Sequence, residues 1–442
     1  MATWALIAVP VFPGRANNDT INMVEELRAG EYTDWWSPLL MMVWKPFYEI
    51  GFGLGFILLG QIAVFFVGIA ALIRPLFVRT WPAVATAVAI CLFPTSYAML
   101  INVIRDTWMT VAVVGCLAVI YRSRRPAPIH GALLLLGCFG IVAARQNGVF
   151  VIVVIAAAAI MHWGLLPNAV HRSIVRRGLF AAAVGVVVGA GFFVTAQLLV
   201  RVTDVTPTGP ETSTYYVDLD EMSTRVGEML VPEVMIRDTL TLDDLAVNRN
   251  YNSDAIGPLV FRRLPPEDRP VATDAWRDAI TTYPRVYLQA RWQMFTRQLG
   301  WSGAPLEPYF PTEVSAEAFP PRSLRLSELS TSYLSMFDAG FWQQSGIVHR
   351  PWIYVAISVA AAWRFGRRWP LLYTIPGIQV AVFAGLFFLT PISKVRLVYP
   401  VYAVGLVSFA FLVLGAETLR RRLQESYPQR TSSGASAASG QD

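Results

Sequence analysis

The chain has few charged residues for its length. Asp, Glu, Lys and Arg make up 15% of its 442 residues, whereas they make up about 25% of a soluble globular domain. Hydrophobic residues make up 55% of the chain, and the mean hydropathy is +0.46. This deficit of charge excludes an ordinary soluble fold and predicts an all-α protein that crosses a membrane several times.

Cysteine and histidine are scarce, and several catalytic motifs are missing. The three cysteines lie inside apolar stretches and the four histidines are scattered, so neither residue type predicts a disulfide or a metal site. The chain lacks a Walker A loop, an HExxH motif and a GxSxG motif, which excludes the enzyme classes that depend on them. Lysine occurs only at Lys45 and Lys394, a bias that indicates a GC-rich bacterial genome.

Acidic residues are absent from four short loops that are rich in arginine. Excess Lys and Arg mark the cytoplasmic side of a membrane protein, so these four loops are predicted to be cytoplasmic. The net charge of +6 then reflects topology and contact with anionic lipids, and not binding to nucleic acid. The loops contain Arg74 and Arg79; Arg122, Arg124 and Arg125; Arg172, Arg176 and Arg177; and Arg364, Arg367 and Arg368.

Apolar stretches predict about ten membrane-spanning helices. They lie at 1–13, 51–73, 81–100, 107–121, 131–144, 148–162, 179–200, 346–363, 371–390 and 398–416. The stretch 131–162 is ambiguous because Arg145, Gln146 and Asn147 interrupt it. Two passes with this triplet at the outer turn fit the charge distribution, and a kinked or re-entrant arrangement stays open.

Two predicted segments lie outside the bilayer on the side opposite the basic loops. Residues 14–50 contain three tryptophans and are typical of helices that lie in the membrane interface. Residues 201–345 are numerous enough for a small folded domain, within which 285–299 is predicted to be a basic, aromatic helix near the membrane surface. The domain organisation is therefore an N-terminal membrane module at 1–200, the outer loop at 201–345, C-terminal membrane helices at 346–416, and a cytoplasmic tail at 417–442 with a disordered end at 429–442.

Three aspartates are candidate catalytic residues on the outer side. Asp19 and Asp34 follow the first predicted helix, and Asp106 opens the fourth. A carboxylate there can deprotonate an acceptor hydroxyl or hold a divalent cation against a phosphate. The alternative for Asp19 and Asp106 is a helix cap, and the alternative for Asp34 is a turn residue.

Cations gather on the same side. Arg145 is a lone arginine in an apolar stretch, and an ionisable residue in such a place is by default expected to belong to a functional site. Lys394 and Arg396 precede Tyr399 at the start of the last predicted helix, and two cations at one membrane face suit a phosphate group. The alternative for these side chains is snorkelling to the membrane surface.

Taken in order, these residues resemble the motifs of the GT-C superfamily, multispanning glycosyltransferases that use polyprenyl-phosphate-linked sugars, in particular its bacterial, family 39-like members. The likeness covers about residues 10–165 and 276–410, and Ser37 departs from it by standing where many members have histidine. The matching elements are Pro13-Gly14 with Asp19, Asp34-Trp35-Trp36-Ser37-Pro38, Arg105-Asp106, Arg145 with Asn147, the stretch 276–300, and Arg396 with Tyr399-Pro400.

The resemblance implies a GT-C-like fold and the transfer of a hexose or pentose from polyprenyl phosphate to a glycan, lipid or protein acceptor. By this likeness Asp19 is the base or orients the acceptor, and Asp106 and Asp34 assist. The lipid phosphate is expected to bind to Arg105, Arg145, Lys394 and Arg396, supported by Asn147 and Tyr399. A divalent cation, Mg²⁺ or Mn²⁺, stays open as a cofactor. The expected location is a bacterial inner membrane, with the active face outside and the C-terminus in the cytoplasm.

Two other classes of protein compete with this interpretation. A transporter or scaffold for lipid-linked saccharides is the first, but a transporter needs polar residues along a path through the membrane, and here they gather at one face. An O-antigen ligase or polymerase is the second, but such enzymes use a pyrophosphate-linked donor and typically lack an acidic first loop. The glycosyltransferase hypothesis is therefore favoured over both.

Overall fold

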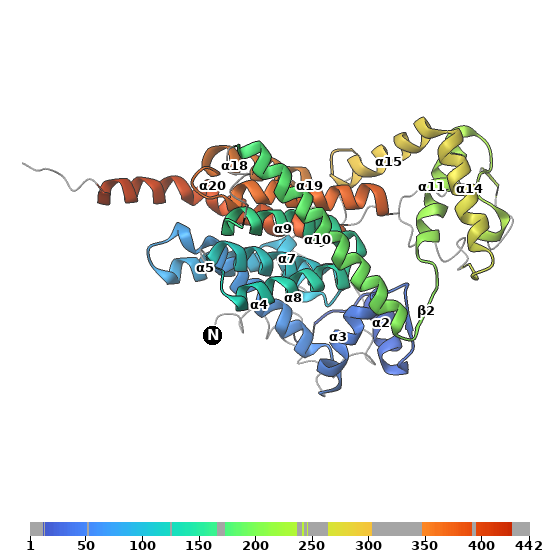
Figure 1. Cartoon of the computed structure of the whole chain (residues 1–442), viewed down its shortest axis with the longest axis horizontal. Coiled ribbons are helices and arrows are strands. Elements are labelled where there is room, and N and C mark those ends of the chain that lie inside the picture. The colour runs from blue at the N-terminus through green and yellow to red at the C-terminus, as the bar shows by residue number, and fades with distance from the viewer. Residues whose placement is uncertain are drawn as a thin grey trace, which may run out of the picture.

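The helices of this protein lie side by side in a long bundle, and a small helical domain lies beyond one end of it (Figure 1). The structure, a computed structural model, describes residues 12, 14–50, 53–123, 126–165, 173–236, 241–242, 245, 264–302, 347–390 and 395–426. The predicted helix at 1–13, apart from Phe12, therefore lies outside the described residues, as do Lys394 and the tail end at 429–442.

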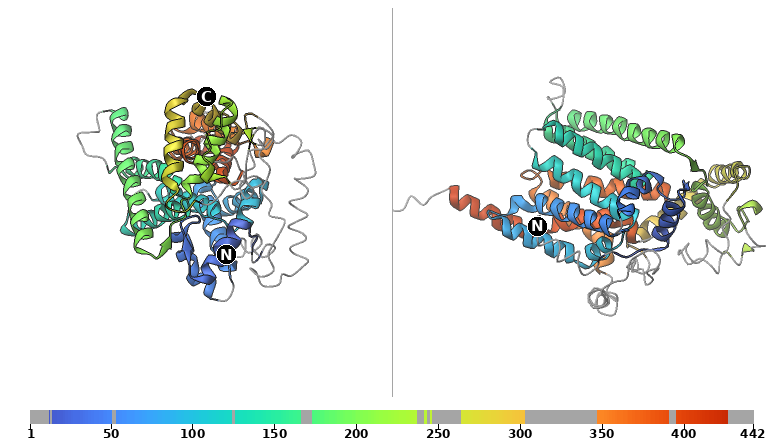
Figure 2. Two further views of the ribbon diagram at one scale, coloured as in Figure 1. Left: turned by 90° about the vertical axis from the view of Figure 1, so that its right-hand side faces the viewer. Right: turned by 90° about the horizontal axis from the view of Figure 1, so that it is seen from below.

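Long apolar helices build the bundle, and their apolar composition is what a bilayer requires. In the right-hand view of Figure 2 most of them run along the long axis of the molecule. Within the described ranges they are α4 (Gly55–Ile73), α5 (Thr80–Leu92), α6 (Pro94–Ile101), α7 (Arg105–Arg122), α8 (Pro128–Ala144), α9 (Val149–Trp163), α10 (Ile174–Val202), α18 (Pro351–Phe365), α19 (Leu371–Leu389) and α20 (Tyr399–Ser426).

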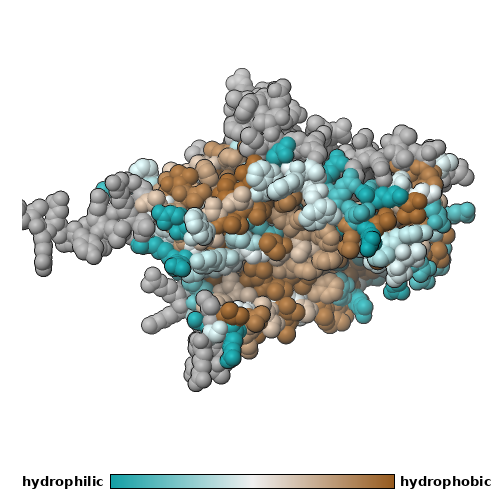
Figure 3. All heavy atoms as spheres, turned by 90° about the horizontal axis from the view of Figure 1, so that it is seen from above, coloured by the Kyte–Doolittle hydropathy of each residue, from teal (hydrophilic) through white to brown (hydrophobic). Residues whose placement is uncertain are grey.

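Several of these helices fit a protein embedded in a membrane. Among the described residues, five are long and apolar enough to cross a bilayer: Gly55–Leu76, Gln146–Trp163, Val175–Val202, Leu371–Leu389 and Arg396–Ala416. A bent pair raises this number to six. Apolar side chains cover the middle of the face in Figure 3, and hydrophilic ones gather toward the ends. The count of about ten spans stays an expectation.

The prediction of one continuous helix at 81–100 is wrong, because this stretch forms two helices, α5 and α6. The axes of α5 and α6 differ by 75°. Pro94 is the cause: it lacks an N–H, and its ring disfavours helical backbone in the residue before it. Phe93 accordingly has extended backbone, with φ −60° and ψ 136°. All eight residues of α6 are buried.

The stretch 131–162 forms two helices, α8 and α9, joined by a 3₁₀ turn at η3 (Gln146–Gly148). The backbone of Arg145 is extended, which ends α8. A Cβ atom on Gly148 would lie 2.9 Å from the Ile141 carbonyl oxygen, whereas residues seven apart in one helix are separated by about 10 Å along its axis. The chain therefore turns sharply at the polar triplet.

The last helix is longer than predicted. α20 continues to Ser426, ten residues beyond the expected end at 416, so the first part of the predicted tail is helical. The sequence there is rich in Glu, Leu, Arg and Gln, which favour helix outside an apolar environment as well as inside it. The Thr418 hydroxyl donates at 2.6 Å to the carbonyl of Leu76, the last residue of the 3₁₀ turn η2 (Arg74–Leu76).

The two segments outside the bundle contact each other. Residues 14–50 form α2 (Asn18–Ala29), β1 (Tyr32–Thr33) and α3 (Pro38–Glu49). β1 pairs in parallel with β2 (Val205–Thr206), with Tyr32 opposite Val205. After β2 come α11 (Glu211–Val226), η5 (Glu233–Met235), α14 (Arg269–Thr282) and α15 (Pro284–Gln298), which we call the loop domain. The loop domain has a hydrophobic core of its own, with Leu219, Met222 and Met235 fully buried.

Candidate functional site

The segment before α2 is fixed against the loop between α6 and α7. Arg15 pairs with Asn102 in a parallel bridge: its N–H donates to the Ile101 carbonyl at 2.8 Å, and its carbonyl accepts from Val103 at 3.0 Å. Gly14 enters this bridge with φ +108°, a backbone conformation that favours glycine. The bridge places the first turn of α2 beside the first turn of α7.

Asp19 is not the cap of α2, because Asn17 has that role. The Asn17 side chain accepts from the Thr20 N–H at 2.8 Å, as an N-cap residue does. The Asp19 carboxylate instead lies 2.7 Å from Arg396 and 3.9 Å from Arg105. Its position in the first helical turn also suits the positive end of the helix dipole.

Asp106 lies in the first turn of α7 and binds Arg145, the residue that follows α8. The cap position is Ile104, whose side chain makes no capping hydrogen bond. Arg145 donates to both carboxylate oxygens of Asp106, from Nε at 2.5 Å and from Nη2 at 2.8 Å. Such a bidentate pair fixes both groups. Arg396 Nε lies 3.9 Å from the same carboxylate.

Local structure holds Arg145 and Arg396 in place. The Ser37 hydroxyl, at the start of α3, donates to the Ala144 carbonyl at 2.8 Å and so ties the first outer loop to the residue before Arg145. Arg396 belongs to the 3₁₀ turn η7 (Val395–Val398), directly before α20, and only 6% of it is exposed. Tyr399, the first residue of α20, is buried as well.

Five charged residues from four segments thus converge, and we call them the charge cluster: Asp19, Arg105, Asp106, Arg145 and Arg396. Three guanidinium groups face two carboxylates, so the formal charge of the cluster is one positive unit. The side chains are between 4% and 18% exposed. A partly exposed cluster with surplus positive charge can bind an anion. The anion can accept hydrogen bonds from the guanidinium N–H groups that now donate to a carboxylate.

Tryptophans border the cluster on the side of the first outer loop. The Arg105 guanidinium lies over the Trp36 ring, 5.6 Å from its centroid, and donates to the Trp35 carbonyl at 3.5 Å. A planar guanidinium stacks well on an aromatic face. From the sequence these tryptophans are predicted to lie in the membrane interface and in the Asp34-Trp35-Trp36-Ser37-Pro38 element, but not to contact an arginine of the site.

Not every predicted site residue joins the charge cluster. Within the described ranges no ion pair links Asp34 to it; both the N–H and the hydroxyl of Thr208 donate to the Asp34 carboxylate, at 2.5 and 2.6 Å. Asn147 follows Arg145, but it lies against α19, where a Cβ on Gly385 would be 3.2 Å from the Asn147 Cβ. Lys394 lies outside the described residues.

The composition of the cluster does not fit a divalent cation. Each of the two carboxylates faces a guanidinium group at 2.5 to 2.7 Å, and three such groups would repel Mg²⁺ or Mn²⁺. Groups of at least three His, Cys, Asp or Glu that could hold a metal are also absent from the part of the chain that the structure describes. The residues of the charge cluster therefore offer no site for the divalent cation that the resemblance left open.

A second buried ion pair, which sequence reasoning missed, lies in the loop domain. Arg291 Nη2 donates to the Asp218 carboxylate at 2.5 Å, and both side chains are 1% exposed. Burial raises the pKa of Asp218, while Arg291 and the Trp276 N–H, at 2.9 Å, oppose that rise. No local signal in the sequence links residues 73 positions apart.

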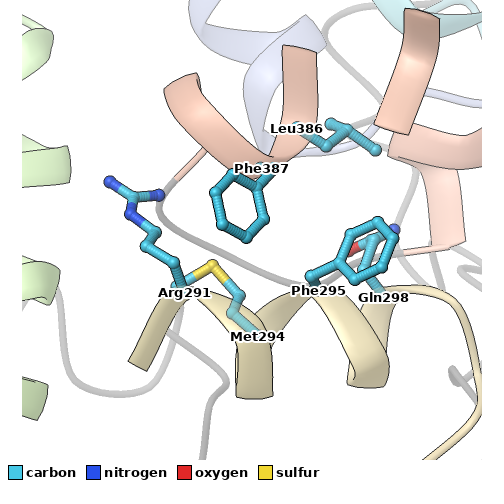
Figure 4. A pocket seen from close by; sticks show the side chains of 6 residues that line it. All are labelled: Arg291, Met294, Phe295, Gln298, Leu386 and Phe387. Carbon is cyan, nitrogen blue, oxygen red and sulfur yellow. The ribbon is translucent and has the colours of Figure 1, made fainter. Parts of the chain in front are cut away.

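A small apolar recess lies between α15 and α19, apart from the residues of the charge cluster (Figure 4). Its lining is Arg291, Met294, Phe295, Gln298, Leu386 and Phe387. Phe295 contacts Phe383 and Phe387 edge-on at 5.7 and 6.0 Å between ring centroids. This packing attaches the loop domain to the bundle, and it offers little polar surface for catalysis.

Comparisons of this chain with protein-family models, with curated proteins and with solved structures found no match.

Proposed function

We propose that this protein is a membrane glycosyltransferase that transfers a sugar from a polyprenyl-phosphate donor to a glycan, lipid or protein acceptor. The observation that carries the proposal is the charge cluster at one end of an apolar bundle, with its surplus positive charge. Arginine is well suited to phosphate because its donors match two phosphate oxygens at once. An isoprenoid chain can remain in the bilayer while its phosphate reaches such a cluster at the membrane face.

The three arginines differ in how firmly they are held. Arg145 is bound to Asp106 through two short hydrogen bonds, so it is a fixed donor with its remaining N–H groups available. Arg396 and Arg105 share Asp19, at 2.7 and 3.9 Å. The donor phosphate takes the place of the Asp19 carboxylate beside Arg396 and Arg105, because it offers more acceptor oxygens.

That exchange makes Asp19 the better candidate for the base. Asp106 is buried and bound on both oxygens, whereas 17% of the Asp19 side chain is exposed. Asp19 accepts the proton of the acceptor hydroxyl, and the acceptor oxygen forms a bond to the anomeric carbon. The bond from that carbon to the phosphate oxygen breaks, its electrons stay on the phosphate, and the guanidinium groups stabilise the charge.

The proposed orientation places the charge cluster outside a bacterial cell membrane. Arg105 and Asp106 of the cluster begin α7, whereas Arg122, which opens one of the arginine-rich loops, ends the same helix. The loop domain extends from the end of the bundle opposite the C-terminal end of α20 (Figure 1). By the positive-inside rule those loops face the cytoplasm. The C-terminus of α20 lies on that cytoplasmic side as well.

Binding of a polyprenyl monophosphate to the purified protein in lipid nanodiscs tests the proposal. Arg396→Ala is expected to weaken binding about tenfold, the loss of one charge-assisted contact. Arg364→Ala is the matched control, because Arg364 is an exposed arginine in the last turn of α18. Equal affinities for the two variants would reject the phosphate role. Sugar transfer is then followed with polyprenyl-phosphate-linked sugars in proteoliposomes.

A non-catalytic protein that binds lipid-linked saccharides is the second candidate. The observation in its favour is that both carboxylates of the cluster are paired with guanidinium groups, as in a site that only binds phosphate. This candidate predicts that the parent protein binds polyprenyl phosphate but transfers no sugar from any donor tested. Asp19→Asn would then strengthen binding, because a competitor for Arg396 is removed.

A further inference from the structure

The loop domain is attached to two segments that each lead to a residue of the charge cluster. One is the first outer loop, which carries Asp19, and the other is the end of α19, which precedes Arg396. The ion pair between Asp19 and Arg396 joins two segments that are far apart in the sequence, so it depends on how these segments are held. The contacts of the loop domain therefore affect the distance between Asp19 and Arg396.

The attachment to the first outer loop is a chain of hydrogen bonds. The Asp34 carboxylate accepts from Thr208, and the Asp34 N–H donates to the Thr206 carbonyl at 3.2 Å. Arg269, at the start of α14, donates to the Pro207 carbonyl at 2.8 Å. The loop domain is thereby bonded to the residue that directly follows β2, the strand that pairs with β1.

The attachment to α19 depends on Arg291. Arg291 Nη1 donates to the Thr390 carbonyl at 2.8 Å, and Nη2 donates to Asp218 at 2.5 Å. Thr390 is the C-cap of α19, where unpaired carbonyls and the helix dipole favour a cation. Thr390 is also close to Arg396 in the sequence. One guanidinium group therefore joins α11, α15 and the end of α19.

We propose that Arg291 is a positioning residue for the charge cluster: it fixes the loop domain to Thr390 and thereby sets the place of Arg396 opposite Asp19. Neither oxygen that Arg291 binds belongs to the cluster, and its side chain is 1% exposed, so it acts through the backbone that it holds. The inference rests on the proposed phosphate site for its functional readout, but the spacing itself can be measured without any ligand.

Lysine at this position separates the two contacts. Lys carries one nitrogen, whereas the planar guanidinium of Arg presents Nη1 and Nη2 in different directions. Arg291→Lys keeps a cation beside Asp218 and loses the bond to the Thr390 carbonyl. Arg285→Lys is the matched control, because Arg285 is an exposed arginine on the same helix. Trp276→Phe is a milder second variant that removes one hydrogen bond to Asp218.

The test uses spin labels at Glu31, in the first outer loop, and at Leu389, which is 50% exposed at the end of α19. Pulsed EPR is expected to show a broader distance distribution in Arg291→Lys, a smaller broadening in Trp276→Phe, and none in Arg285→Lys. Polyprenyl monophosphate affinity is expected to fall about tenfold in Arg291→Lys.

Two outcomes separate this inference from the proposed function. A distance distribution in Arg291→Lys and Trp276→Phe that matches the parent would overturn the positioning role, whatever the protein binds. A broader distribution in those variants, together with a parent that binds no polyprenyl monophosphate, would support the positioning role while the proposed function fails.

Discussion

Two Arg–Asp pairs lie toward the same end of the molecule, and they differ in exposure and in charge balance. Arg291 and Asp218 are 1% exposed, and their charges cancel. Arg145 and Asp106 are equally close, at 2.5 Å, but 16% of the Arg145 side chain is exposed. Two further arginines and one aspartate lie beside the second pair. Among the described residues of the charge cluster, positive charges therefore outnumber negative ones by one.

The difference shows what each pair is suited to do. The partners of the first pair include Trp276 and the Thr390 carbonyl, so its contacts within the protein join four helices, α11, α14, α15 and α19. The second pair holds Arg145 in a defined orientation, and the other arginines of the charge cluster give the site a surplus of positive charge. A neutral, fully buried pair contributes to specific structure, whereas a partly exposed cluster with surplus charge is arranged to bind an anion.

The largest expected effect comes from breaking the neutral pair. Asp218→Ala is expected to lower the free energy of unfolding of the loop domain by about 3–5 kcal/mol, because Arg291 is left buried and unpaired. Limited proteolysis and thermal unfolding measure the change. Asp274→Ala is the control, since Asp274 is 70% exposed in a surface pair with Arg277. A similar stability in both variants would contradict the role given to the pair.

The second prediction concerns chemistry in the charge cluster. Asp19→Asn is expected to lower the rate of sugar transfer by a factor of about 10²–10⁴, the usual contribution of a general base, while the protein still folds and inserts. Glu25→Gln is the control, because Glu25 is an exposed carboxylate on α2, the same helix as Asp19. Full transfer activity of Asp19→Asn would exclude Asp19 as the base.

The third prediction ranks the arginines. Arg105→Ala is expected to weaken polyprenyl monophosphate binding about threefold, less than the tenfold expected for Arg396→Ala, because Arg105 is more exposed and farther from Asp19. Titration calorimetry of both variants gives the ranking. If Arg105→Ala has the larger effect, the donor phosphate binds on the Trp36 side of the cluster.

The smallest expected effect tests the support of Arg145. Ser37→Ala removes the hydrogen bond to the Ala144 carbonyl and is expected to cost about 1 kcal/mol of stability. Chemical denaturation of the purified protein measures this. Ser37→Thr keeps the hydroxyl and serves as the control, and a loss of stability in Ser37→Thr alone would point to packing instead of hydrogen bonding.

Part of the candidate site could be predicted from the sequence. The distribution of arginines is enough to predict that Asp19, Asp106, Arg145 and Arg396 share one face, and the structure brings these four side chains together. The bonding partners could not be predicted. Asp106 is adjacent to Arg105 in the chain but binds Arg145, and Asn17 instead of Asp19 caps α2. Such choices depend on small differences in distance that only packing fixes.

The fold shows the same division. Apolar composition determined that the chain forms long apolar helices of the kind that a bilayer requires, because a bilayer satisfies no backbone hydrogen bonds. The polar triplet after α8 determined a break there. The 75° bend before Pro94, the length of α20 and the pairing of β1 with β2 were decided by local sterics and tertiary contacts. The link between Arg291, Asp218 and Thr390 was decided by the tertiary structure alone, because its three members are far apart in sequence and meet only where the helices pack.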